Sequence, residues 1–259
     1  MKLGVSYNVF DGEELLEGSI KCIRSEVDYI SVIYQTISNY KNFCSPELEP
    51  LLERLKSEGL IDELVHFKTD LNDHPPCNEV NKRRLGLELS LKQGCTHHMS
   101  MDTDEYYLLD DFKRLKKEMI DGDYDSSACT YITYYKSSNY RLQHIDTTYV
   151  SLIYKIRPNI TYILGNKFPV KIDPTRSMNE GKCRIFEPNE LVMHHLSYVR
   201  KNINSKVYNS SSKVLYEKYI DNFLEHFNKW QPGEKGITVG MVVPSATIVE
   251  TEDLFNIKF

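Results

Sequence analysis

Residues 82–105 read KRRLGLELSLKQGCTHHMSMDTDE, and this stretch decides the fold. Its first part has the composition of a helix, which Gly94 ends. A strand is predicted over 95–101, and the acidic residues Asp102 and Asp104 come directly after it. A helix that leads within a few residues into a short buried strand is typical of α/β proteins, in which helices connect the strands of a parallel sheet.

The same alternation of strands and helices extends back to the N-terminus. Asp11 and Glu14 have the spacing of a capping box, which predicts that a helix begins there. The predicted elements before residue 102 are strands over 3–9, 29–34, 64–67 and 95–101, with helices from about 11, over 46–58 and over 78–93. Right-handed crossovers between parallel strands predict a doubly wound, Rossmann-like sheet. Ligands bind such sheets at the carboxyl ends of the strands.

The second half of the chain has less regular patterns. We expect a helix over 109–120, aromatic strands over 124–135 and 148–156, a loop-rich region over 157–190 and a helix over 212–230. The last helix has an apolar stripe that includes Leu215 and Phe223, which would pack on the sheet or on a partner.

Bulk composition excludes several classes of protein. The net charge of −5 and the pI near 5.9 lack the basic excess of a nucleic-acid-binding protein. No apolar run has the length of a transmembrane segment, and the N-terminus lacks the features of a signal peptide. Six scattered cysteines without a C-x-x-C motif favour reduced thiols. We therefore expect a cytoplasmic protein with no nucleic-acid partner.

Asp102 and Asp104 give the strongest chemical signal. A hard divalent cation such as Mn²⁺ or Mg²⁺ takes oxygen ligands, and anionic ligands offset the loss of its water. Two carboxylates that leave one strand end lie near the edge where such a sheet binds its ligands, so the pair predicts a metal that bridges the protein to a diphosphate. The same spacing also occurs in solvated turns and helix caps, so the pair alone does not identify a site.

Two other groups of residues carry the charges and imidazoles that such a site uses. Lys82 and Arg83 precede the acidic pair by one helix and would suit phosphate, although an exposed basic helix face has the same pattern. His194 and His195 fall on an extended segment, where adjacent side chains point to opposite faces, so only one of them would reach a metal. Arg200 follows closely and is a second candidate for phosphate, with surface charge as the alternative.

These pieces occur in the order found in one family. The stretch 82–105, with D-P-T-R at 173–176 and M-H-H-L-S-Y-V-R-K-N at 193–202, resembles the family-2-like glycosyltransferases of the GT-A fold, in a bacterial and large-DNA-virus subgroup. The resemblance implies an α/β fold with a Rossmann-like, mostly parallel sheet flanked by helices, a smaller acceptor-side β region and a C-terminal helix. It also implies metal-dependent sugar transfer from a nucleotide-diphosphate sugar, with a UDP-sugar favoured, to a glycan or lipid-linked acceptor in surface polysaccharide or glycoprotein glycan synthesis.

The resemblance implies roles for individual residues. The nucleotide base would lie against Tyr7, Asn8 and Val9, and the nucleotide or its phosphates would contact Lys82 or Arg83, Thr103 and Arg200. Asp102 would approach the ribose or the metal. Mn²⁺ or Mg²⁺ would be bound by Asp104 together with His194 or His195.

The catalytic base is the weakest part of the resemblance. The E-D acceptor motif of many inverting members does not stand at its expected place, so Asp173 is the first candidate for the base and Asp146 the second. A turn-capping role before Pro174 explains Asp173 equally well.

We expect one domain over 1–259. Residues 1–108 would form the nucleotide-sugar-binding half, 109–205 the acceptor-side half and 206–259 the C-terminal helix and tail. The protein would be free in the cytoplasm or peripheral to the inner face of the membrane. Two alternatives stay open. The first is a sugar nucleotidyltransferase or a metal-dependent phosphohydrolase on a similar sheet, although the N-terminal glycine-rich phosphate loop that favours a nucleotidyltransferase is missing. The second is a non-catalytic binding module.

Overall fold

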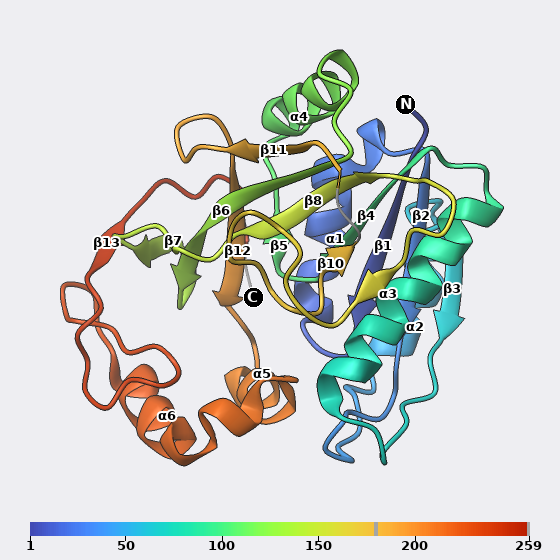
Figure 1. Ribbon diagram of the computed structural model, residues 1–259. Helices are drawn as coiled ribbons and strands as arrows, with labels where there is room; N and C mark the ends of the chain where they lie inside the picture. The colour runs from blue at the N-terminus through green and yellow to red at the C-terminus, as the bar shows by residue number, and fades with distance from the viewer. Residues whose placement is uncertain (179–180, 258–259) are drawn as a thin grey trace.

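A large sheet with helices on both faces forms the centre of the computed structural model, which describes residues 1–178 and 181–257. Figure 1 shows its strands and helices. The strands are β1 (Leu3–Val9), β2 (Tyr29–Tyr34), β3 (Glu63–His66), β4 (His97–Asp102), β5 (Glu105–Tyr106), β6 (Ser126–Tyr135), β7 (Ser137–Leu142), β8 (Val150–Lys155), β9 (Tyr162–Ile163), β10 (Ser177–Met178), β11 (Cys183–Phe186), β12 (Val192–Tyr198) and β13 (Ile248–Glu250). The helices are α1 (Glu13–Ile23), α2 (Leu48–Ser57), α3 (Pro75–Lys92), α4 (Leu109–Asp121), α5 (Ile203–Asn209) and α6 (Ile220–Lys229), with 3-10 turns η1 (Arg24–Glu26), η2 (Lys213–Leu215) and η3 (Glu217–Tyr219).

The order of the strands brings the predicted site to one edge of the sheet. The order is β13-β7-β6-β8-β4-β1-β2-β3, with β11 and β12 paired to β6, and β5 paired to β12. Strands β3, β2, β1 and β4 are parallel neighbours, and the antiparallel β8 separates them from β6. Asn8 is in register with Asp102, and Val9 with Tyr34, so β1, β2 and β4 end together. The predicted α/β fold, with a mostly parallel central sheet flanked by helices, is confirmed.

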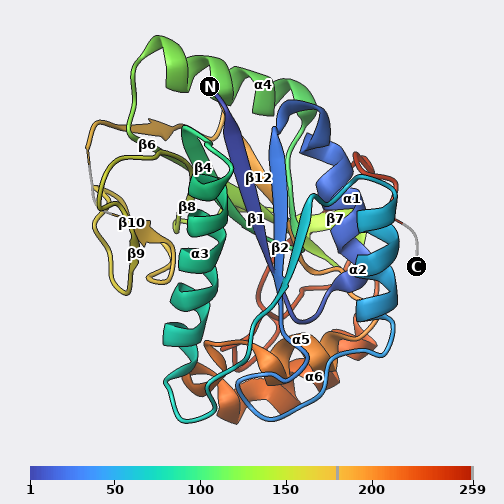
Figure 2. The ribbon, with the colours of Figure 1, turned by 90° about the vertical axis from the view of Figure 1, so that its right-hand side faces the viewer.

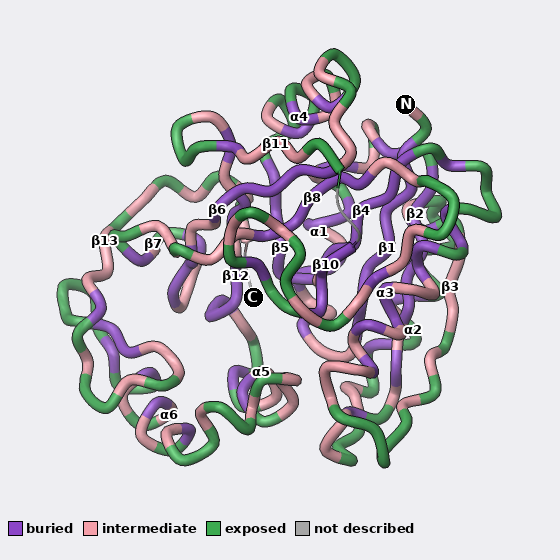
Figure 3. Tube along the Cα trace, viewed as in Figure 1, coloured by how far each residue is buried: buried purple, intermediate pink, exposed green. Residues whose placement is uncertain are grey.

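The helices cover both faces of the parallel strands. In Figure 2, α3 lies on one side of β1 and β2, and α1 and α2 lie on the other. All seven residues of β1 are buried, and the central strands form the main buried region of Figure 3. Burial on both faces explains the nearly continuous apolar character of β1 and β2. Within the described ranges, none of the helices combines the length and apolar character needed to cross a membrane.

The start of α1 differs from the prediction. The helix itself is confirmed, but its N-cap is Gly12 with φ 72°, and no side chain caps it. The capping box predicted for Asp11 and Glu14 is therefore wrong. Because a left-handed residue turns the chain into the helix, the carboxylate of Asp11 is left at the wall of a cavity instead of the helix end.

The helix predicted over 212–230 is only half correct. Its first part forms the two 3-10 turns η2 and η3, and a regular helix is present only in α6. Phe223 and Phe227 pack with Tyr135 of β6 and with Trp230, so α6 docks on the molecule as the sheet-docking alternative predicted. Leu215 is 79% exposed. A helix over 212–219 would add little stability, because Leu215 would gain no burial from it.

Candidate functional site

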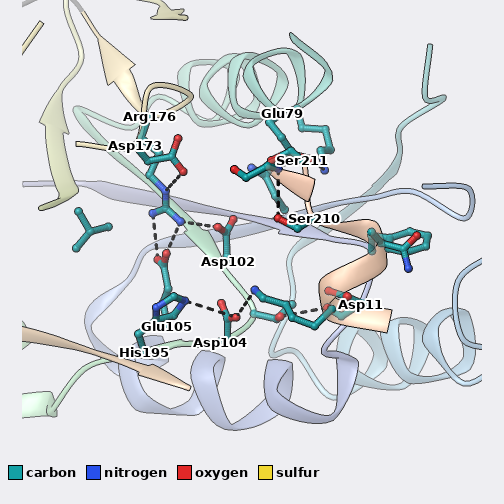
Figure 4. A pocket seen from close by; sticks show the side chains of 18 of the residues that line it. Asp11, Glu79, Asp102, Asp104, Glu105, Asp173, Arg176, His195, Ser210 and Ser211 are labelled. Carbon is teal, nitrogen blue, oxygen red and sulfur yellow. Dashed lines mark hydrogen bonds and ion pairs between the residues drawn. The ribbon is translucent and has the colours of Figure 1, made fainter. Parts of the chain in front are cut away.

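A cavity of about 270 Å³ opens where β1, β2 and β4 end. Its wall comes from segments far apart in the sequence, which the sheet order brings to one edge. Residues from six of these segments are Asn8, Gln35, Lys82, Asp104, Asp173 and Lys206. Figure 4 shows Asp102, Glu105 and Asp173 around Arg176, and Asp104 beside His195.

Asp104 follows β4 and is 1% exposed. Its Oδ2 pairs with Arg200, lies 2.9 Å from Nζ of Lys206 and lies 3.6 Å from Nε2 of His195. Burial alone would raise the pKa of Asp104, but the charges of Lys206 and Arg200 hold it well below its usual value. Asp104 is therefore a carboxylate at neutral pH, flanked by two cations that also line the cavity.

Asp102 ends β4 and is held between two guanidinium groups. Its Oδ2 lies 2.6 Å from Nη2 of Arg176, and its Oδ1 lies 3.2 Å from Nη2 of Arg83. Arg83 also donates to Oγ of Ser100 at 2.7 Å. Burial acts to raise the pKa of Asp102, but Arg176 and Arg83 outweigh it and lower the pKa. The side chain is 36% exposed, so this fixed carboxylate still reaches the cavity.

Glu105 is a third carboxylate of this corner, 2% exposed at the start of β5. Both of its oxygens pair with Arg176, whose Nη1 lies 3.2 Å from Oε2. Burial raises the pKa of Glu105 although Arg176 acts to lower it. Asp102, Glu105 and Arg176 therefore form one buried ion network, drawn in Figure 4.

Asn8 and Gln35 give the cavity a polar end without charge. Asn8 is 7% exposed and Gln35 is 2% exposed. In the described part of the chain, neither Nδ2 nor Oδ1 of Asn8 has a hydrogen-bond partner, and neither has Oε1 of Gln35, whose Nε2 donates to the carbonyl of Ile37 at 3.0 Å. Unpaired buried polar atoms are costly, so these amides are candidates for hydrogen bonds to a bound ligand or to ordered water.

The neighbours of Asn8 on β1 do not reach the cavity. Tyr7 and Val9 are fully buried in the main core, on the other face of the strand. The hydroxyl of Tyr7 lies 3.1 Å from Oγ of Ser19 on α1. Of the three residues predicted to lie against a nucleotide base, the geometry supports Asn8 alone.

The remaining predicted nucleotide contacts divide in a similar way. Lys82 lines the cavity, with Nζ 3.0 Å from Oε1 of Glu79, whereas Arg83 faces Asp102. Thr103 also lines it, and its hydroxyl donates to the carbonyl of Asp11 at 3.2 Å. Of the two basic residues offered as alternatives, Lys82 is thus the one that lines the cavity.

The two histidines of β12 point to opposite faces, as the extended segment predicts. His195 lines the cavity beside Asp104. His194 is buried behind it, where its Nδ1 lies 2.9 Å from the hydroxyl of Tyr134 and its ring lies 5.0 Å from that of Phe255. Burial lowers the pKa of His194 to about 4. The geometry therefore speaks against His194 as a metal ligand and leaves His195.

Asp173 and Asp146 lie on the side of the cavity formed by the second half of the chain. Asp173 lines it with a side chain that is 47% exposed. Its Oδ1 accepts from the backbone and the hydroxyl of Thr175, which leaves Oδ2 toward Nε of Arg176 at 4.0 Å. Asp146 is not part of the wall; it accepts from the backbone of Thr148 at 2.8 Å and adjoins Tyr131, which does line the cavity.

Several residues of the site carried no assigned role in the sequence, among them Gln35, Glu105, Arg176 and Lys206. Glu105 and Arg176 stand inside the quoted motifs, directly after Asp104 and at the end of D-P-T-R, and that position was the available signal. Lys206 lies on the short helix α5, beyond the last motif. No local pattern links Lys206 to Asp104, because 102 residues separate them.

No protein-family model and no curated protein matches the chain. Among solved structures, the chain is similar to S. aureus TarS 1–349, with 9% identity over 90% of this chain and 76% of that one, at a TM-score of 0.49. The structure of S. aureus TarS 1–349 in complex with UDP aligns with 11% identity over 51% of this chain and 36% of that one, at 0.39. CMP:2-keto-3-deoxy-manno-octonic acid synthetase complexed with CTP aligns with 10% identity over 56% and 64%, at 0.35.

These similarities are low. The chain spans about a third of the TarS structure in complex with UDP and 41% of the longer S. aureus TarS structure. An activity therefore has to be argued from the site itself.

Proposed function

We propose that this protein is a GT-A-type glycosyltransferase that transfers a sugar from a nucleotide-diphosphate sugar, with a UDP-sugar favoured, to a glycan or lipid-linked acceptor. One observation carries the proposal: the carboxylates Asp102 and Asp104 stand at the end of β4, in a cavity that also holds the cations Arg200 and Lys206. A nucleotide sugar needs a place for its base, for its diphosphate and for the reacting sugar. The cavity has surfaces suited to all three.

The base and ribose fit the end of the cavity near β1 and β2. The free amide of Asn8 can donate and accept at once, which suits the edge of a nucleobase. Gln35 adds an acceptor whose orientation is fixed, because its Nε2 is committed to a carbonyl. Asp102, held from two sides, is placed to accept from ribose hydroxyls.

The diphosphate fits the middle of the cavity. Arg200 and Lys206 both pair directly with the one carboxylate of Asp104, and the charge of Asp11 acts on them as well. A diphosphate brings additional negative charge, which Arg and Lys bind well in a partly buried site. Lys82, which also lines the cavity, is a further contact.

The residues at this corner fit Mn²⁺ or Mg²⁺ as part of a shared site. Asp104 supplies a carboxylate and His195 an imidazole nitrogen 3.6 Å from it. Among the residues that the structure describes, no three His, Cys, Asp or Glu side chains are grouped to hold a metal by themselves. A cation here would therefore take its other ligands from phosphate and water, as Mg²⁺ usually does. When bound, the ion supplies a Lewis acid for the departing diphosphate.

The sugar acceptor fits the side formed by Tyr131 and Asp173. Asp173 has one carboxylate oxygen free of the Thr175 turn, so it is the group best placed to take a proton from the acceptor hydroxyl. The ring of Tyr131, edge-on to His195 at 5.2 Å, offers an apolar surface for a sugar. Asp146 stands behind Tyr131 and serves to orient that ring, so Asp173 remains the first candidate for the base.

Nucleotide binding tests the proposal. With Mn²⁺ present, a ligand at 100 times its Kd should raise Tm by roughly 5 °C. We expect this for UDP in a series with GDP, dTDP and CMP. Asp104→Asn should abolish the shift, whereas Asp110→Asn, whose side chain is 96% exposed on α4, should keep it.

Product analysis separates the possible reactions. A glycosyltransferase releases the nucleoside diphosphate from the sugar nucleotide, whereas a nucleotidyltransferase or a phosphohydrolase would yield pyrophosphate or inorganic phosphate. The proposal fails if none of the four nucleotides shifts Tm, or if phosphate or pyrophosphate is the stoichiometric product.

A further inference from the structure

Arg176 contacts three carboxylates that belong to different parts of the site. It is 3% exposed and immediately precedes β10. Its Nη2 lies 2.6 Å from Asp102, its Nη1 lies 3.2 Å from Glu105, and its Nε lies 4.0 Å from Asp173. Figure 4 shows this guanidinium with Asp173 on one side and Asp102 and Glu105 on the other.

The backbone of Arg176 is fixed on the acceptor side of the molecule. Its carbonyl accepts from Oγ of Ser151 at 3.1 Å and from the hydroxyl of Tyr154 at 2.6 Å, both on β8. Its amide donates to the carbonyl of Asp173 at 3.0 Å, which closes the turn that carries the candidate base. The guanidinium therefore reaches from an anchored turn and is not the tip of a loose loop.

Charge compensation alone does not explain this geometry. Glu105 is buried and needs a cation, and Arg176 supplies it. The same guanidinium also reaches Asp102, which already has Arg83 as a partner. A planar guanidinium can hold two carboxylates in fixed directions at once, which an ammonium group cannot do.

We propose that Arg176 is a positioning residue that sets the donor and acceptor halves of the site relative to each other. Through Asp102 it fixes the carboxylate that meets the donor, and through its turn it fixes Asp173 on the acceptor side. The role rests on the proposed function, but the placement of the two segments is a property of the free protein and is testable without a substrate.

The test separates positioning from charge balance by using Glu105→Gln as the background. Replacing Arg176 alone would leave the buried carboxylate of Glu105 without a partner. Glu105→Gln removes this charge, so a second substitution at position 176 should be tolerated by the fold. Arg176→Gln and Arg176→Lys are each made in this background. Arg184→Gln is the matched control, because Arg184 also pairs with two carboxylates, Glu118 and Glu190, outside the cavity.

Hydrogen exchange gives the readout that does not depend on the function. In the doubly substituted Arg176→Gln protein, amides of 102–105 and of 173–176 should both exchange about tenfold faster than in Glu105→Gln alone. The lysine variant should fall in between, and Arg184→Gln should leave both segments unchanged. Unchanged exchange in either segment of the Gln variant would overturn the proposal, whether or not the protein binds a nucleotide.

Titration with UDP and Mn²⁺ gives the second readout. We expect the Kd of the Gln double variant to be weaker by about tenfold than that of Glu105→Gln, with Arg176→Lys restoring part of the loss. Equal Kd values would also overturn the positioning role. A wild-type protein that binds no nucleotide would instead defeat the proposed function, and hydrogen exchange would still decide the role of Arg176.

Discussion

Gly12 lies so close to Arg200 that no side chain fits there. A Cβ at this position would come within 1.5 Å of Nη1 of Arg200 and 2.6 Å of Oγ1 of Thr103. The backbone has φ +72°, which costs an L-residue about 1–2 kcal/mol. We predict that Gly12→Ala lowers the free energy of unfolding by more than this strain and weakens UDP binding by about tenfold, because Arg200 is displaced from Asp104.

Gly59→Ala is the control for backbone strain. Gly59 has φ +76°, and a Cβ there would meet nothing within 4 Å. Urea unfolding should show a loss of about 1–2 kcal/mol, and the Kd for UDP should stay unchanged. If Gly12→Ala binds UDP as tightly as Gly59→Ala does, Arg200 has no part in nucleotide binding.

Asn8 should show opposite effects on stability and binding. Its buried amide has no partner among the described residues, so Asn8→Ala removes a desolvated group at no loss of a protein hydrogen bond. The free energy of unfolding should stay the same or rise by about 1 kcal/mol, while the Kd for UDP weakens by about tenfold. Calorimetry and urea unfolding check this, with the exposed Asn139→Ala as control. A stability loss with unchanged binding would contradict a ligand role.

The sequence could indicate the acidic corner. It could not indicate which residue of each adjacent pair, Tyr7 or Asn8 and His194 or His195, faces the cavity. Asp102 and Asp104 are recognisable because both follow one strand, and any parallel sheet brings that end to its ligand-binding edge. Alternation separates Asn8 from Tyr7, and His195 from His194. It does not say which face has the cavity, because β1 is buried on both faces. Only the packed structure resolves this choice.

At the scale of elements, α3 is pressed against β1 at Gly86. A Cβ there would lie 2.2 Å from Oγ and 2.4 Å from Cβ of Ser6. In an exposed helix Gly→Ala stabilises by about 1 kcal/mol. We predict that Gly86→Ala instead destabilises by roughly 1–3 kcal/mol, because helix and strand must separate. Urea unfolding checks the sign, with the exposed Glu88→Ala expected within about 0.5 kcal/mol of wild type. A Gly86→Ala variant more stable than wild type would show that α3 and β1 can separate at this contact at little energetic cost.

The sequence predicted well those strands and helices that belong to the central sheet or pack on it. The strands β1 and β2 have the predicted bounds, and α3 only begins three residues early, at Pro75, where proline suits the first turn of a helix. The failure at 212–219 has a different cause. Leu215 matches the helical spacing of the stripe, yet it is 79% exposed. Periodicity reports a potential apolar face, and only tertiary packing decides whether that face is used.

At the scale of the whole molecule, buried histidines couple stability to pH. Burial lowers the pKa of His97 to about 4, of His98 to about 3 and of His194 to about 4. In the unfolded chain these groups return to about 6.5. Between these values the unfolded state binds more protons than the folded state, so stability falls as the pH falls. Each histidine contributes about 1.4 kcal/mol per pH unit inside its window.

The carboxylates of the site modify this dependence, Asp102 and Asp104 at its acid end and Glu105 above pH 4.5, inside the window of the histidines. The lowered pKa of Asp102 and of Asp104 adds to the loss below about pH 4, whereas the raised pKa of Glu105 favours the folded state as the pH falls. We therefore predict a steep decrease in the free energy of unfolding from pH 6.5 to 4.5 and little change from pH 7 to 8, measured by urea unfolding at each pH. His98→Asn, which keeps a polar partner for Ser90 on α3 without a titrating ring, should flatten the slope by about 1.4 kcal/mol per pH unit. A wild-type curve that stays flat down to pH 4.5 would mean that these imidazoles become protonated inside the folded protein, and that the start of β4, where His97 and His98 lie, is more open to water than its burial indicates.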